Sequence, residues 1–159
     1  LLNWNNPFSR PAEWDPLDAM GNPNSGSARI GNPLPGNNAT LFVLNQCRPR
    51  IANQAYRFGA KAQLLLDAPP FVGAGIVATV HATPDCSDVQ LDSYSALPFT
   101  GATVWVQSEG LVPASVTAGS IRVWLAIAKP TGVNTTISAR FDDVFLVPTP
   151  LFADGFESQ

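Results

Sequence analysis

The sequence predicts an all-β protein, an antiparallel β-sandwich of about eight strands. Short stretches in which apolar and polar residues alternate recur along the chain, separated by turn-forming residues. No helix longer than a turn or two can be placed. The 15 prolines and 12 glycines among 159 residues interrupt helices and supply turns. A chain of this length is expected to form one domain with a sizeable core.

The clearest alternation runs from Tyr56 to Leu66, where aromatic and aliphatic residues share one face and Arg57, Lys61 and Gln63 share the other. The segment before Pro35 is expected to be irregular, because it is rich in proline, apart from one short strand. The expected strands are Ser25–Ile30, Ala39–Cys47, Tyr56–Leu66, Gly75–His81, Thr103–Gln107, Ser120–Lys129, Thr135–Ala139 and Arg140–Val147.

Charge and composition exclude several classes of partner. Charged residues make up 13% of the chain, and the net charge is -3. Nucleic acids and anionic membranes are bound by clustered Lys and Arg, so neither is an expected partner. No apolar run is long enough to cross a bilayer. The abundance of Asn, Ser, Thr, Pro and Gly is typical of an extracellular β-protein. The chain begins at Leu1, so it is expected to be processed or excised from a longer protein.

Cys47 and Cys86 lie in segments that resemble the ends of strands. A structural disulfide is favoured over redox or metal chemistry, because the chain has no CxxC motif and a single histidine. Such a bridge implies an oxidising compartment, and hence a secreted or cell-surface protein.

Outward-facing residues of the Ser120–Lys129 strand suggest a binding surface. Ile121, Val123, Leu125 and Ile127 are expected to point inward, so Arg122 and Trp124 point outward on one face. Together with Tyr94, they could stack on the faces of sugars or form a protein interface. The alternative is that a loop or the N-terminal segment covers Trp124.

The sequence carries no catalytic constellation. It has no GxSxG, HExxH, phosphate-binding or dinucleotide motif. Its one histidine, His81, ends a strand, and a lone histidine is more often structural than catalytic. The protein is therefore predicted to be non-catalytic.

The order of short motifs resembles a known family. The motifs are Trp4, Ser25–Ala28, Gln46-Cys47, Tyr56–Ala60, Cys86, Trp105-Val106, Ile121–Ala128 and Phe141–Leu146. This series covers nearly the whole chain and resembles the jelly-roll modules of secreted bacterial proteins, similar to the 4/9-type carbohydrate-binding modules. The resemblance implies a jelly-roll topology, and it names a glycan as one candidate ligand. Each motif alone is weak, and the fold hosts many functions.

The same resemblance implies a structural calcium ion, because an Asp near the start of the last strand commonly helps to hold one in that family. Asp142 or Asp143 stands at that position. Neighbouring strand residues face opposite ways, so only one of the two is expected to reach an ion. The alternative is a pair of solvated or turn-capping carboxylates. No other cofactor is expected.

The chain departs from the family at its two ends. The modules usually begin with a strand of the type Asn-Gly-Asp/Gly-Phe-Glu/Asp, but this chain starts past it and carries Asp154-Gly155-Phe156-Glu157 at the other end. Residues 1–147 are thus expected to form the sandwich, and residues 148–159 a proline linker with a strand-like extension. That extension could fill its own sheet, belong to a next domain, or insert into a neighbouring protomer. Its expected strand residues are Leu151, Phe152, Asp154 and Phe156.

These observations favour a non-catalytic, secreted structural subunit of an extracellular assembly or filament, a homo-oligomer that donates its C-terminal segment to a neighbour. The competing hypothesis is a carbohydrate-binding module that recognises a glycan. A third is an accessory domain of a larger secreted hydrolase.

Overall fold

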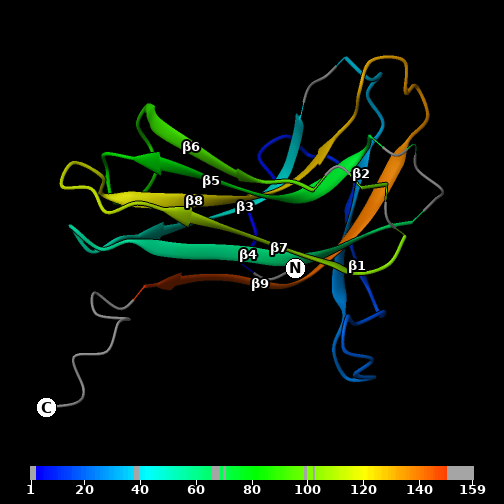
Figure 1. Ribbon diagram of the computed structural model, residues 1–159, viewed down its shortest axis with the longest axis horizontal. Coiled ribbons are helices and arrows are strands. Elements are labelled where there is room, and N and C mark those ends of the chain that lie inside the picture. The colour runs from blue at the N-terminus through cyan, green and yellow to red at the C-terminus, as the bar shows by residue number, and fades with distance from the viewer. Residues whose placement is uncertain are drawn as a thin grey trace, which may run out of the picture.

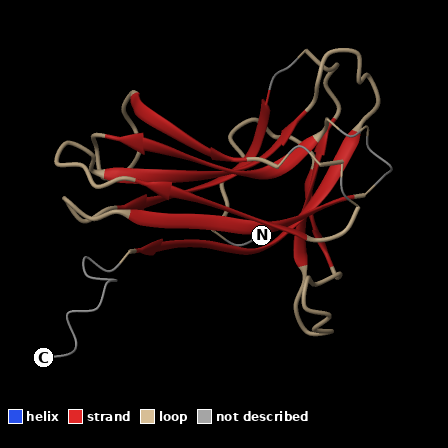
Figure 2. Cartoon of the chain, in the orientation of Figure 1, coloured by secondary structure: helices blue, strands red, loops and turns tan. Residues whose placement is uncertain are grey.

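The protein is a two-layered β-sandwich (Figures 1 and 2). The computed structural model describes residues 3–37, 40–65, 69, 71–98, 100–101 and 103–149. These residues form nine strands and contain no helix, so none of them belongs to a helix that could cross a membrane. The strands are β1 (Ala12–Asp15), β2 (Ser27–Asn32), β3 (Thr40–Pro49), β4 (Tyr56–Leu64), β5 (Gly73–His81), β6 (Gln90–Ala96), β7 (Val106–Val112), β8 (Ser120–Ala128) and β9 (Ile137–Pro148).

One sheet has five strands in the order β1-β2-β9-β4-β7, and the other has four in the order β3-β8-β5-β6. All the pairings are antiparallel. In Figure 1 the two sheets lie one above the other, and the loop between β1 and β2 projects away from them on the side of the five-stranded sheet. The predicted fold class, an all-β antiparallel sandwich, is confirmed.

The core fills the space between the sheets. The alternation predicted for β4 is confirmed, because Phe58, Ala60, Ala62 and Leu64 are all buried, whereas Arg57 is exposed. Strand β8 supplies the facing layer, as predicted, through Ile121, Val123, Leu125 and Ile127. A third, smaller cluster of Val77, Trp124 and Ala126 lies on the other side of the four-stranded sheet.

The predicted disulfide is present. Cys47, near the end of β3, is bonded to Cys86 in the loop between β5 and β6, with their Cα atoms 6.1 Å apart. The disulfide links the end of β3 to the loop that follows β5, and β8 lies between these two strands in the sheet. Arg122 donates a hydrogen bond to the Cys86 carbonyl, and Ser120 donates one to the Thr83 carbonyl. The bonded loop is therefore also held by β8.

Two strands are absent from the sequence prediction, one is displaced, and the two strands predicted at Thr135–Ala139 and Arg140–Val147 form the single strand β9. β6 is a sheet edge whose first four residues are all exposed, so it lacks an apolar face to reveal it. β1 is also an edge strand and has only four residues. The predicted strand Thr103–Gln107 is in fact β7, which begins at Val106 and continues to Val112. In β7 Gly110 faces the core, where a Cβ atom would lie 2.4 Å from the Phe58 ring.

Candidate functional site

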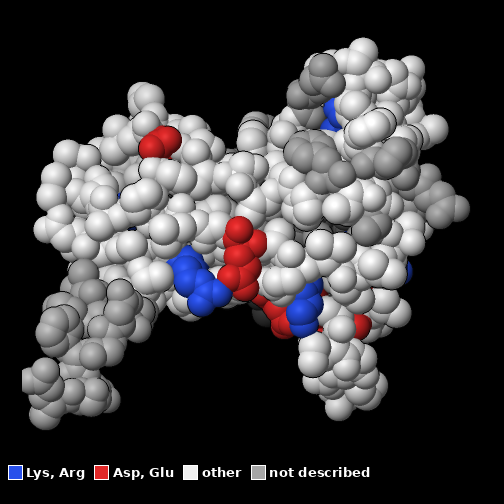
Figure 3. Space-filling view, in the orientation of Figure 1, with Lys and Arg blue, Asp and Glu red and all other residues white. Residues whose placement is uncertain are grey.

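The outer face of the five-stranded sheet carries a row of paired charges. In β4 the residues that alternate with the core, Arg57, Gly59, Lys61 and Gln63, point to this face. Figure 3 shows side chains of both signs gathered along the hollowed underside of the molecule, next to the projecting β1–β2 loop. The pairs that join neighbouring strands or their loops are Arg29–Glu13, Arg140–Asp15, Lys61–Asp143 and Arg57–Glu109.

The pair of Arg140 and Asp15 is the best shielded of the four. The Arg140 Nε atom lies 2.9 Å from an Asp15 carboxylate oxygen, and the Asp15 side chain is only 10% exposed. Burial raises the pKa of Asp15, but hydrogen bonds from the backbone N–H of Leu17 and from the Arg140 guanidinium lower it by more. The pKa of Asp15 therefore lies below its ordinary value. Asp15 is therefore ionised at neutral pH and fixes β1 to β9.

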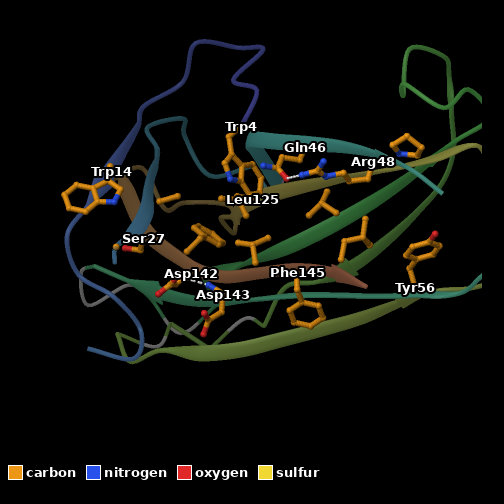
Figure 4. A pocket seen from close by; sticks show the side chains of 17 residues that line it. Trp4, Trp14, Ser27, Gln46, Arg48, Tyr56, Leu125, Asp142, Asp143 and Phe145 are labelled. Atoms are coloured by element: carbon orange, nitrogen blue, oxygen red, sulfur yellow. Dashed lines mark hydrogen bonds between the residues drawn. The ribbon is translucent and has the colours of Figure 1, made fainter. Parts of the chain in front are cut away.

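An aromatic ring lies among these charges. Phe145 of β9 pairs with Gly59 of β4, and a Cβ atom at Gly59 would lie 2.6 Å from the Phe145 ring. Only glycine leaves room for the ring to lie across β4. Figure 4 shows Phe145 directed away from the space between the sheets. Because Arg57 and Lys61 flank Gly59 on the same face, the ring has a cation on each side along the strand.

The two aspartates predicted to include a calcium ligand do not face opposite ways, which corrects that expectation. Two β9 residues, Asp143 and Val144, lie opposite Ala60 alone, which is a β-bulge, and Asp143 has a φ of 48°. The bulge breaks the alternation. Asp142 is the register partner of Lys61, and the Asp143 carboxylate lies 2.7 Å from the Lys61 ammonium, so both belong to the outer face.

The donors around these aspartates do not fit a calcium site. One Asp142 oxygen accepts from the backbone N–H of Ala19, and the other accepts from the N–H of Asp143. Asp143 is neutralised by Lys61. Calcium takes six to eight oxygen ligands. Within the described ranges no three His, Cys, Asp or Glu side chains come together to hold a metal. The Asp142 carboxylate therefore matches the turn-capping alternative, whereas Asp143 pairs with Lys61, which neither alternative included.

The predicted platform of Trp124, Arg122 and Tyr94 is not an open surface. Trp124 does point away from the inter-sheet core, but it is only 8% exposed. Phe8 of the N-terminal segment stacks on it at 6.3 Å between ring centroids, and Phe42 of β3 packs at 5.5 Å. Arg122 lies over the same ring. The covered alternative is thus the observed one, because apolar area on this face is buried by the segment before β1.

Tyr94 lies apart from Trp124. It packs against the core cluster that contains Ile76 and Val123, and its hydroxyl donates to Asp92 at 2.6 Å. The Asp92 carboxylate raises the pKa of Tyr94. Tyr94 therefore does not extend a stacking surface around Trp124.

A groove of about 630 Å³ opens between the two sheets at one side of the sandwich (Figure 4). Trp4 and Trp14 lie at its rim, and neither was predicted to share a site with β9. Residues from β2, β3, β4, β8 and β9 line it together with the two tryptophans: Trp4, Trp14, Gly26, Ser27, Ala28, Gln46, Arg48, Pro49, Tyr56, Val123, Leu125, Phe141, Asp142, Asp143, Val144, Phe145 and Leu146. The predicted assembly residues Leu151, Phe152, Asp154 and Phe156 lie outside the described residues.

Comparison with known proteins shows what this fold resembles. No protein-family model and no curated protein matches the chain. Solved structures do match. A family 16 carbohydrate-binding module is 15% identical, with a TM-score of 0.55, and the match covers 91% of this chain and 89% of that one. The CBM22-2 xylan-binding domain of Paenibacillus barcinonensis Xyn10C is 12% identical, with a TM-score of 0.54 and coverage of 94% and 93%.

A third match is a CBM61 module in complex with β-1,4-galactotriose, 15% identical, with a TM-score of 0.52 and coverage of 92% and 87%. Some other matches lie within longer enzyme chains. The fold is therefore the β-sandwich of carbohydrate-binding modules, as the sequence resemblance implied. At these identities the likeness defines the fold and leaves the ligand open.

Proposed function

We propose that the protein is a non-catalytic, secreted carbohydrate-binding module. The observation that carries the proposal is the match of more than nine tenths of the chain to modules of this class. Two of those modules are described as a xylan-binding domain and as a complex with β-1,4-galactotriose. The disulfide supports an oxidising, extracellular setting.

The glycan-binding surface in this proposal is the outer face of the five-stranded sheet. An aromatic ring offers its face to the apolar side of a pyranose, and Phe145 lies over Gly59 of β4 and is partly exposed. Arg57, Lys61 and Glu109 around it carry hydrogen-bonding groups suited to hydroxyls. These side chains come from three adjacent strands, so a chain of several sugars would cross the strands of the sheet.

The pairing of charges favours a neutral glycan. Each cation named on this face has an anionic partner, so none of these cations is left unpaired to attract an acidic glycan. An acidic polysaccharide would have to compete with Glu109, Asp143 or Asp15 for its cation. A neutral polysaccharide such as a xylan, glucan or galactan can accept and donate hydrogen bonds without breaking the pairs.

Isothermal titration calorimetry against soluble neutral oligosaccharides tests the proposal, with Phe145→Ala as the diagnostic variant. Loss of the ring is expected to weaken binding about tenfold, which corresponds to about 1.4 kcal/mol. Phe71→Ala is the matched control, because Phe71 is 68% exposed and lines no part of this face. It should bind as the unmodified protein does. No binding across a broad panel, or equal losses in both variants, would contradict the proposal.

A second candidate function is structural. The observation that favours it is the edge of β9 from Asp142 to Pro148, which has no strand partner on the side away from β4 among the described residues. In this function the C-terminal segment of one protomer is donated as a strand to its neighbour, so that copies join into an extracellular assembly. The two functions share part of their surfaces, because Phe145 and Asp143 of the proposed glycan face also line the groove beside β9.

A further inference from the structure

The last strand, β9, is paired on both sides along only part of its length. β2 pairs with it from Ile137 to Phe141, and β4 pairs with it through to Pro148. The pairing of β2 with β9 ends near Gly26. There the chain packs so closely on β1 that a Cβ atom on Gly26 would lie 2.5 Å from the Asp15 carbonyl oxygen. From Asp142 onward, one edge of β9 has no strand beside it within the residues that the structure describes. Unpaired edges of this kind accept a further strand.

The groove lies along this edge. Its lining comes from both sheets and is mixed. Val123 and Leu125 of β8 lie opposite Phe141 and Val144 of β9, and the polar part includes Gln46, Arg48, Asp142 and Asp143. Strand β3 closes the other side, and there too only a single bridge, Asn5 to Asn45, pairs with its outer edge in the described part of the chain. The groove is thus bounded by two sheet edges, and its long direction follows β9 (Figure 4).

One polar group in the groove has no partner. Ser27 at the end of β2 is 3% exposed and lines the groove, and its hydroxyl makes no hydrogen bond to any described residue. A buried hydroxyl without a partner costs about 1–3 kcal/mol, so such groups normally find one. A backbone group of an added strand could supply it only if the end of β2 opened, because the Ser27 oxygen has almost no accessible surface.

We propose that this groove accepts residues 151–157 of a second copy of the chain as an extended strand beside β9. The inference rests on the second candidate function and names its acceptor. An edge of seven residues, from Asp142 to Pro148, matches a donor of seven residues at about 3.4 Å per residue. Phe152 and Phe156 fall on one side of an extended strand, so both can face the apolar part of the lining.

The donor comes from a second copy because the geometry after β9 opposes a direct return. The N–H of Thr149 donates to the Ala55 carbonyl, so the chain is still on the β4 side of β9 at that point. A two-residue hairpin through Thr149 and Pro150 would need a positive φ at Thr149, which a β-branched residue rarely adopts. A longer return loop would include Leu151 and Phe152, and these residues would then be missing from the donor strand. Donation from copy to copy is a head-to-tail contact, which extends into a chain unless it closes into a ring.

Analytical ultracentrifugation of the full chain over a range of concentrations tests whether copies associate. Mass is expected to rise with concentration, and an excess of a synthetic peptide of residues 151–159 should return the protein to monomers. A scrambled peptide of the same composition should not. The variant Phe152→Ser with Phe156→Ser should remain monomeric. The matched control, Leu151→Ser with Ala153→Ser on the other side of the strand, should associate within a few-fold of the unmodified chain.

Hydrogen–deuterium exchange then locates the acceptor. Assembled protein should protect amides between Asp142 and Val147 at least tenfold more than the double phenylalanine variant does. Association without this protection would overturn the groove as the acceptor while leaving the assembly function intact. Protection of these amides in a protein that stays monomeric would show a donor from the same chain and overturn donation between copies. A monomer with unprotected amides would overturn both the inference and the assembly function.

Discussion

The outer faces of the two sheets differ in what covers them. Both carry an aromatic residue beside an arginine: Trp124 with Arg122 on β8, and Phe145 near Arg57 on the five-stranded sheet. On the four-stranded sheet the N-terminal segment places Phe8 on Trp124, with Arg10 over the Phe8 ring. On the five-stranded sheet the corresponding ring rests on Gly59 and stays at the surface.

This difference teaches where function can be sought. Alternation along a strand tells which side chains leave the core, but another segment can then bury them. The covered face has become a second small core, since Val77, Trp124 and Ala126 are each at most 8% exposed. The face around Phe145 keeps exposed ion pairs and is the one on which a ligand can bind. Substitutions on the covered face should therefore affect stability, and substitutions on the open face should affect binding.

The largest expected effect is that of Trp124→Ala. Removing a buried indole that contacts Phe8 and Phe42 should lower the free energy of unfolding by about 3–5 kcal/mol. Urea denaturation followed by far-UV circular dichroism measures it. Trp14→Ala is the control, because Trp14 is 59% exposed, and it should change the free energy by less than about 1 kcal/mol. Equal effects of the two variants would mean that Trp124 is not covered.

Removing the disulfide should have a comparable effect on the covered sheet. The bond joins residues 39 positions apart, and closing a loop of this size is worth about 4 kcal/mol on the chain-entropy model. Cys47→Ala with Cys86→Ala should lower the urea midpoint accordingly, with glycan affinity unchanged if the folded fraction is held near one. A loss of glycan affinity in the fully folded double variant would instead place the binding surface near the disulfide.

The fold could be predicted from sequence because its buried strands alternate clearly. β4 and β8 show an apolar face and a polar face, and the two cysteines lie at positions that can bridge. Edge strands β1 and β6 were not predicted, since an edge strand with exposed residues carries little pattern. β9 ends at Pro148, and both the predicted boundary of the sandwich at residue 147 and the role of the residues beyond it stay predictions.

The candidate site was harder to predict, for two physical reasons. The cover on Trp124 comes from Phe8, which is distant in sequence and lies in a segment without periodicity. The open ring, Phe145, has its place because a bulge at Asp143 shifts the alternation by one residue. Two consecutive aspartates in β9, near Gly59 of the neighbouring strand β4, could have suggested a bulge. The position of the bulge, however, depends on how β9 and β4 pair in the folded protein. The expectation that Asp142 and Asp143 face opposite ways came from regular alternation, and the bulge makes it wrong.

On the open face, Arg57→Met should weaken glycan binding by a few-fold and leave stability almost unchanged. The guanidinium pairs with Glu109 at the surface, and exposed ion pairs contribute about 0–1 kcal/mol. Methionine keeps the length of the side chain but removes its hydrogen-bond donors. Calorimetric titration of the best ligand and a thermal melt measure the two quantities. A melting temperature that falls while affinity holds would assign Arg57 a structural role only.

The smallest expected effect is a pH dependence from Asp15. Its pKa in the folded protein lies below the ordinary value of 3.8, so ionised Asp15 stabilises the fold above that pH, and this contribution is lost as the pH falls through the folded value. Asp15→Asn should cost about 1 kcal/mol at pH 7, and the difference should shrink below pH 3.8. Glu13→Gln, which breaks an exposed pair with Arg29, should cost close to nothing at either pH.

The most direct test of the central claim, that the open face of the five-stranded sheet binds a neutral glycan, is an NMR titration of labelled protein with xylan, glucan and galactan oligosaccharides. The account predicts that one of them shifts the amides of Arg57, Gly59, Lys61, Glu109 and Phe145, while those of Trp124 and Val77 stay in place. Shifts centred on β8 and β5 instead, or no shift with any of the three, would contradict it.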